Sequence, residues 1–230
     1  MALNYVITTV QTPAASTNLT TLLNVKTDLA LSGAVPEDDI FLRRAIVQVT
    51  QAAQDYCNRT FAQQTYQDLV RPERDRAARF IPARRGYYKT AVSPLVSVTS
   101  VIEDYLGDNQ TTLVQGTDFE VDLTQNAIYR LDTNGQPRDW YSYPLQVIYV
   151  AGYTLPPATS PTPLLPATVE DAVIRMLKAK WDARNRDPTL KVREVAGVGR
   201  DEFWISNTKD GAMTPDITDL LYAYRVNTVA

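Results

Sequence analysis

Two stretches with helical periodicity, one near each end of the chain, enclose a central block that alternates like β-strands. The helical stretches cover residues 20–60 and 164–225, and the block covers residues 61–153. Each helical stretch is amphipathic, so each needs another apolar face to cover it. We therefore predict an α+β protein. In it, N- and C-terminal segments form a small helical bundle, and the middle of the chain is an inserted β-rich domain.

Four helices are expected in the two terminal stretches. A short one lies between Thr20 and Leu31, and the strongest begins at Pro36, where three acidic residues suit the positive end of the helix dipole. The third is expected to begin with Thr168 as its N-cap, and the fourth at Thr214-Pro215, a cap residue followed by proline. The apolar stripe of the strongest helix, spaced by three and four, is predicted to be Ile40, Phe41, Ala45, Val49, Ala52, Ala53 and Tyr56.

Period-two alternation of apolar and polar residues predicts strands in the central block. Asn134-Gly135 is typical of a hairpin turn within that block, because both residues tolerate a left-handed backbone. The expected strands are residues 61–70, 95–101, 117–123, 127–131 and 145–150.

The remaining segments flank or join these blocks. Residues 1–19 are polar and without a clear period, so we expect an N-terminal arm, extended or disordered. Residues 154–163 form a proline-rich, semi-rigid link. Residues 188–213 are expected to be a long loop, and residues 226–230 a C-terminal tail.

Composition excludes several classes of enzyme. The chain has no histidine, which removes Ser-His-Asp and Cys-His catalysis and the usual zinc sites. Its one cysteine, Cys57, falls late in an amphipathic helix and is expected to be a small buried side chain. The pairs Asp38-Asp39 and Asp216/Asp219 are better explained by helix capping and exposure than by a metal or carboxylate site. We expect no catalytic residue, metal or cofactor, and no apolar run is long enough to span a membrane.

Four short motifs stand in a definite order along the helical stretches and the last strand. They are Val25-Lys26-Thr27-Asp28-Leu29 with Asp38-Asp39 and the helix to Tyr56-Cys57-Asn58-Arg59-Thr60; Val147 to Tyr153; Leu165 to Trp181 with Arg184-Asn185; and Leu220-Leu221-Tyr222-Ala223-Tyr224-Arg225. In this order they resemble the head–tail connector (adaptor) proteins of long-tailed bacteriophages. The long N-terminal segment, the large β block and residues 188–213 depart from that family's pattern.

The resemblance implies a structural subunit without catalytic residues. Such a subunit forms a homo-oligomeric ring, expected to be dodecameric, beneath the portal protein in the neck of the virion, after assembly in the host cytoplasm. The ring extends the DNA channel, where genomic DNA passes without sequence-specific contact, and offers a platform for the tail or a tail-completion protein. Because the family's C-terminal region commonly contacts the portal, the resemblance favours Tyr222, Tyr224 and Arg225 as partner-binding residues.

Opposite charges are concentrated in two neighbouring segments. Residues 71–89 carry seven basic residues against Glu73 and Asp75, while residues 90–129 have acidic residues and no lysine or arginine. Both segments can simply be solvated faces. Alternatively, Arg84 and Arg85 of one subunit meet Glu103 and Asp104 of the next, which would fix the register of a head-to-tail ring.

Two other functions are compatible with parts of the sequence. The basic run 71–89 leaves open a nucleic-acid-binding accessory protein, although the net charge of −3 and the absence of interleaved aromatics among the arginines argue against tight binding. An enzyme using paired carboxylates is disfavoured, because no pair of acids has a cleft signature. Phe203 and Trp204, in the expected 188–213 loop, are either tucked onto the core or an anchor for a partner.

Overall fold

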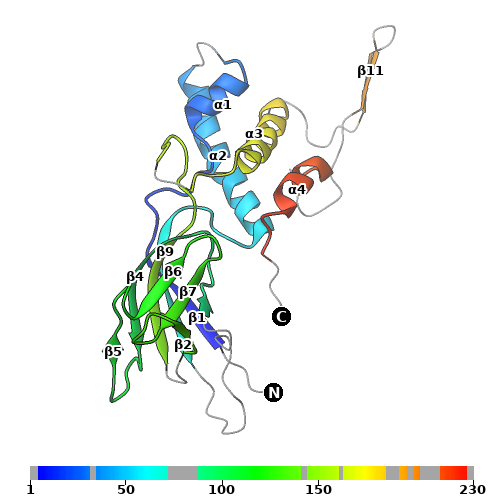
Figure 1. Ribbon diagram of the computed structural model, residues 1–230. Helices are drawn as coiled ribbons and strands as arrows, with labels where there is room; N and C mark the ends of the chain where they lie inside the picture. The colour runs from blue at the N-terminus through cyan, green and yellow to red at the C-terminus, as the bar shows by residue number, and fades with distance from the viewer. Residues whose placement is uncertain are drawn as a thin grey trace. The chain divides into compact units, whose positions relative to one another are not determined.

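The computed structural model of the chain (Figure 1) divides into two compact units. The β unit comprises Met1–Ser16, Ala62–Thr154 and Ser160–Pro163, and the helical unit comprises Thr17–Phe61, Leu155–Thr159 and Leu164–Ala230. The α+β class predicted from the sequence is confirmed. The structure describes residues 5–31, 35–71, 87–140, 144–160, 163–184, 192–195, 199–202 and 213–226.

A five-stranded antiparallel sheet forms one layer of the β unit. Its strand order is β1-β2-β9-β4-β5, so β9 lies in the centre although it is the last of the five in the chain. All the pairings between neighbouring strands are antiparallel. The strands are β1 (Tyr5–Thr12), β2 (Gln64–Arg71), β9 (Leu145–Ala151), β4 (Leu95–Glu103) and β5 (Thr111–Thr112).

A smaller antiparallel sheet forms the second part of the β unit. Its order is β3-β7-β6, and β8 pairs with β7. The predicted turn at Asn134-Gly135 is confirmed: it connects β7 to β8, and Gly135 has a φ of +73°. The strands are β3 (Tyr87–Lys89), β7 (Ala127–Leu131), β6 (Phe119–Asp122) and β8 (Pro137–Arg138).

The two sheets share one apolar core. Strand β2 alternates strictly between buried and half-buried side chains, as a strand with one covered face should. Strand β9 is buried at five of its seven positions, consistent with its central place. The fully buried members of this core include Val101, Ile128, Val147, Tyr149 and Ala151.

The helical unit contains α1 (Leu22–Asp28), α2 (Pro36–Cys57), α3 (Ala167–Asp182) and α4 (Pro215–Tyr222), close to the predicted helices. Helix α3 packs against each of the other three. Pro215 lies in the first turn of α4, as predicted. The inward face of α2 is Leu42, Ala45, Ile46, Val49, Ala53 and Cys57.

Two details of the predicted helices are wrong. Ile40 is 70% exposed rather than buried, because two residues correspond to about 200° around a helix and Leu42 faces the core instead. Thr168 is not the N-cap of α3, which is Pro166. The Thr168 hydroxyl lies 2.9 Å from the Tyr224 hydroxyl and links α3 to the C-terminal segment.

Two segments have more regular structure than their sequence suggests. Residues 5–12 of the expected N-terminal arm form the edge strand β1. Within the expected 188–213 loop, β10 (Val192–Val195) and β11 (Gly199–Glu202) pair as an antiparallel hairpin. In both cases, cross-strand hydrogen bonds supply an order that the side-chain pattern does not signal. No helix within the described ranges is long and apolar enough to cross a membrane.

Candidate interaction surfaces

Five of the nine predicted partner-binding residues lie in the part of the chain that the structure describes. They are Glu103, Asp104, Tyr222, Tyr224 and Arg225. Arg84, Arg85, Phe203 and Trp204 lie outside the described residues, as does most of the basic run 71–89. The proposed pairing of Arg84 and Arg85 with an acidic surface therefore stays a prediction.

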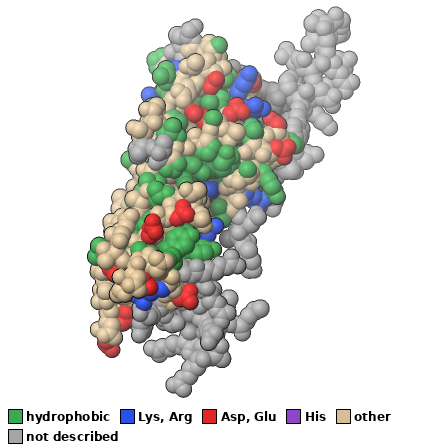
Figure 2. All heavy atoms as spheres, viewed as in Figure 1, with side chains coloured by type: hydrophobic (Ala, Val, Ile, Leu, Met, Phe, Trp, Pro, Cys, Tyr) green, Lys and Arg blue, Asp and Glu red, His purple; other side chains and the backbone are tan. Residues whose placement is uncertain are grey.

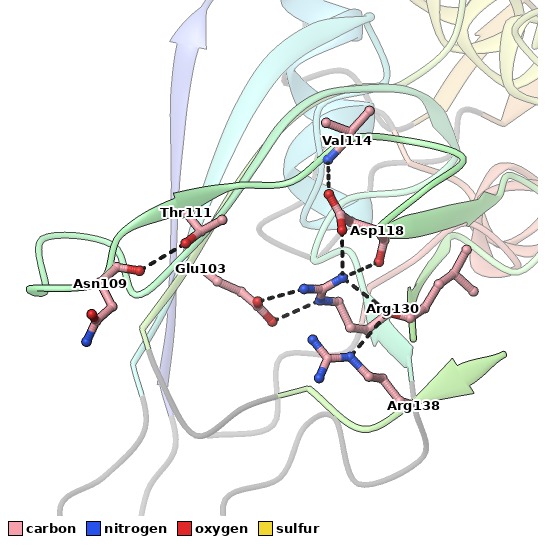
Figure 3. Close-up of polar contacts among 8 residues, drawn as sticks. Glu103, Asn109, Thr111, Val114, Asp118, Arg130 and Arg138 are labelled. Carbon is pink, nitrogen blue, oxygen red and sulfur yellow. Dashed lines mark hydrogen bonds and ion pairs between the residues drawn. The ribbon is translucent and has the colours of Figure 1, made fainter. Parts of the chain in front are cut away.

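Glu103 forms a buried ion pair with Arg130 (Figure 3). The Arg130 Nε donates to Glu103 Oε1 at 3.2 Å, and Nη2 donates to Oε2 at 3.1 Å. Arg130 Nη1 also donates to the carbonyl oxygen of Asp118 at 2.6 Å. Both Glu103 and Arg130 are 7% exposed. The pair joins β4 of the larger sheet to β7 of the smaller one, so Arg130 neutralises the charge of Glu103 within the β unit.

The Asp104 side chain is also engaged, by a hydrogen bond within its own loop. It is 9% exposed, and its Oδ2 accepts a hydrogen bond from the Asn109 backbone N at 2.9 Å. Glu103 and Asp104 therefore do not form the exposed acidic surface that the sequence suggested. The reason is that Arg130 lies just beyond the acidic segment and folds back onto it. Asp108 and Glu120 are the exposed acids of this segment whose side chains remain available to a partner.

A hollow of about 680 Å³ lies beside Arg130 and is lined by the β7–β8 turn. The polar groups that line it already bind one another. Asp132 Oδ1 accepts from the Asn134 and Gln136 backbone N atoms, both at 2.8 Å, and these bonds lower the pKa of the Asp132 carboxyl. Arg138 Nε donates to the Leu131 carbonyl oxygen at 3.2 Å. This arrangement stabilises a turn and offers no activated nucleophile or base.

The three C-terminal residues differ in how their side chains are engaged. Tyr224 packs edge-on against Phe61, with ring centroids 6.4 Å apart, and the Arg225 guanidinium lies 5.3 Å from the centre of the Tyr56 ring. Tyr222 is 69% exposed. Of the three C-terminal residues predicted to bind a partner, Tyr222 is therefore the one whose aromatic ring is open to a partner.

The structure also exposes residues that the sequence analysis assigned elsewhere. Ile40 and Val47 of α2 are 70% and 55% exposed, with the exposed Arg43 and Arg44 between them. The sequence signal was present, since both arginines lie off the predicted apolar stripe, but Ile40 was assigned to the core. On the face shown in Figure 2, charged side chains of both signs are interspersed with hydrophobic ones.

The acidic pair Asp38-Asp39, at the start of α2, binds cationic side chains. Asp38 lies 2.5 Å from Arg184, and Asp39 lies 2.5 Å from Lys26. The described residues contain no group of three or more side chains that could hold a metal ion. Cys57 is fully buried, as predicted, and burial raises the pKa of its thiol to about 11. A thiol with so high a pKa is a poor nucleophile at neutral pH.

Comparison with solved structures gives matches along nearly the whole chain. The chain is similar to one in the neck of an empty GTA particle, computed with C6 symmetry, at 15% identity and a TM-score of 0.51. It is also similar to one in the virion of a native gene transfer agent (GTA) particle, at 13% identity and a TM-score of 0.53. Each match covers 97% of this chain and 97% of the other chain.

The chain has the fold of these GTA chains. The predicted resemblance to head–tail connectors is confirmed at the level of the fold, because one match lies in a particle neck. No protein-family model and no curated protein sequence matches the chain.

Proposed function

We propose that this chain is a structural subunit of a phage-like neck, a head–tail connector without enzymatic activity. The observation that carries the proposal is the match to a chain of a GTA neck over 97% of both chains. The four connector-like motifs of the sequence support it independently, because they were identified from residues alone. In the described residues, Asp38 and Asp39 form ion pairs, Asp132 stabilises a turn, and Cys57 is buried.

In this proposal, copies of the chain form a ring beneath the portal protein, and genomic DNA passes through its channel. The ring extends that channel and presents a platform to the tail or to a tail-completion protein. The C6 symmetry of the GTA neck is compatible with a ring of subunits, including the predicted twelve. Assembly in the host cytoplasm and residence in the virion neck follow from the same role.

Deletion of the gene from its phage or phage-like element tests the proposal. We expect filled heads without tails, or heads that lose their DNA, when the particles are imaged by electron microscopy. Supplying the chain from a plasmid should restore tailed particles. Tailed particles that retain their genome in the absence of the chain would overturn the proposal.

A further inference from the structure

We propose that two faces of the helical unit bind each other between neighbouring copies of the chain. The basic face consists of Ile40, Arg43, Arg44 and Val47 on α2. The acidic face consists of Asp216, Asp219, Tyr222 and Val226 on and just after α4. This inference rests on the proposed function and names the subunit contact within the ring.

The basic face lies on the side of α2 that points away from the core. Ile40, Arg44 and Val47 are spaced by four and three residues, opposite the buried Leu42 and Val49. Ile40 and Val47 are 70% and 55% exposed. These two exposed branched apolar residues share one face with two arginines, and this mixed face is the surface that we assign to a partner.

The positive charge of this face is not neutralised nearby. Neither Arg43 nor Arg44 forms an ion pair with any other residue that the structure describes. Lys180 of α3 hydrogen-bonds to Gln48 on the next turn of α2. Its pKa is lowered by partial burial and by the repulsion of Arg44. The basic face therefore carries unpaired cations that an acidic partner would stabilise.

The acidic face lies on the outer side of α4. Asp216, Asp219 and Tyr222 follow one another at intervals of three residues, while the inward Ile217 and Leu221 are 2% and 0% exposed. Tyr222 and Val226 are 69% and 46% exposed. Asp219 is exposed and forms no ion pair among the described residues, and Asp216 lies 3.8 Å from Arg175 with more than half of its side chain exposed.

The two faces cannot meet within one copy. Helix α4 contacts α2 near the C-terminal end of α2, where the Tyr56 hydroxyl donates to the Thr218 carbonyl oxygen at 3.4 Å. The basic face ends at Val47, about 14 Å earlier along the axis of α2. A contact between two different faces is heterologous, and such contacts close into rings when the rotation between copies allows it.

A second copy of this chain fits these faces better than other partners do. Each face offers two charges and two apolar side chains, with two arginines against two aspartates. Arginine and tyrosine are enriched at protein interfaces, where the apolar groups supply area and the charges fix register. Nucleic acid would be repelled by the acidic face, and the basic face carries only two arginines, flanked on both sides by the apolar Ile40 and Val47.

Cross-linking between two variants tests the contact. Chains carrying Val47→Cys are mixed with chains carrying Tyr222→Cys and treated with a short bis-maleimide, while the native Cys57 stays buried. We expect cross-linked heterodimers in the mixture and far fewer dimers from either variant alone. A chain carrying both substitutions should give a ladder of oligomers. Pairing Val47→Cys with Leu23→Cys, a 73% exposed position on α1, is the matched control and should give background yield.

Charge reversal tests whether the ion pairs contribute. Arg44→Glu in the Val47→Cys chain should lower the heterodimer yield roughly fivefold, as expected for the loss of about 1 kcal/mol. Asp219→Arg in the Tyr222→Cys chain should restore the yield. The effect should be larger at low salt than at high salt.

The same cross-linking is carried out with concentrated purified chains and with particles assembled from the variants. Background yield in both preparations would overturn the subunit contact even if gene deletion abolishes tails. A specific cross-link together with normal tails after deletion would instead preserve the contact and overturn the neck function. The two failures are therefore distinguishable.

Discussion

Gly152 occupies a position where a side chain has no room. Its φ is +114°, and a Cβ built on it would lie 2.4 Å from the Ala62 carbonyl oxygen. The glycine is the penultimate residue of the Val147-to-Tyr153 motif, directly after β9, where the chain passes close to the start of the β2 segment. The glycine of this motif therefore has a steric explanation.

Gly152→Ala should lower the free energy of unfolding by roughly 2–4 kcal/mol, because left-handed strain adds to a clash with backbone. Gly135→Ala is the matched control, since Gly135 also has positive φ but nothing lies within 4 Å of its Cβ position. It should cost about 1 kcal/mol. Urea unfolding followed by fluorescence measures both. Equal losses would show that the contact with Ala62 contributes nothing.

Arg130 and Glu103 depend on each other because both are buried. Arg130→Met should destabilise the β unit by roughly 3–5 kcal/mol, since it leaves a carboxylate buried without its partner. The double variant Arg130→Met/Glu103→Leu should recover most of that loss. Arg175→Met removes an exposed pair with Asp171 and should cost at most about 1 kcal/mol. Chemical denaturation of the unmodified chain and the three variants measures these losses of stability. A double variant no more stable than Arg130→Met would contradict the mutual dependence of the two residues.

At the scale of elements, β1 protects the edge of β2. Its Thr8 hydroxyl donates to Asp68 Oδ1 at 2.7 Å, and Asp68, fully buried in β2, also accepts from the Tyr88 hydroxyl and the Ala91 backbone N. Without β1, the backbone N–H and C=O groups of β2 that now pair with β1 would be left open at the edge of the sheet.

A chain that begins at residue 13 should therefore self-associate and exchange the amide hydrogens of β2 faster. Light scattering and hydrogen exchange over Gln64–Arg71 measure the two effects. Thr8→Val in the full chain is the control: it removes one hydrogen bond, should cost about 1 kcal/mol, and should leave the protein monodisperse under the same conditions. A truncated chain as well behaved as this control would show that β1 is dispensable.

Some elements are predictable from the sequence and others are not, for a physical reason. Helix α2 and strands β4 and β9 were predictable because one face or both faces are buried, and burial imposes a period on the sequence. Strand β1 was not, because its threonine-rich side chains are mostly exposed and its order comes from pairing with β2. The burial of Glu103 could not be predicted either, because its partner Arg130 lies on another strand, 27 positions away in the sequence.

At the scale of the whole molecule, the arginines of the basic run remain candidates for a second subunit contact. Arg84→Glu/Arg85→Glu should weaken ring assembly, and the loss should depend on salt because charges at a subunit contact are screened. Lys89→Glu, an exposed change at the far end of the run, should have less effect. Analytical ultracentrifugation at low and high salt, with the portal protein present, measures the ring. Unchanged yields at both salt concentrations would exclude these arginines from the contact.

The central position of β9 has a consequence for synthesis on the ribosome. Residues 64–71 and 95–103 can pair with it only after residue 151 has left the exit tunnel. The helical unit folds later, because the inward face of α2 stays uncovered until α3 and α4 have been translated. The central sheet can therefore fold during synthesis before the helical unit does. Helices α1 and α2 are the ones that a chaperone would bind in the meantime.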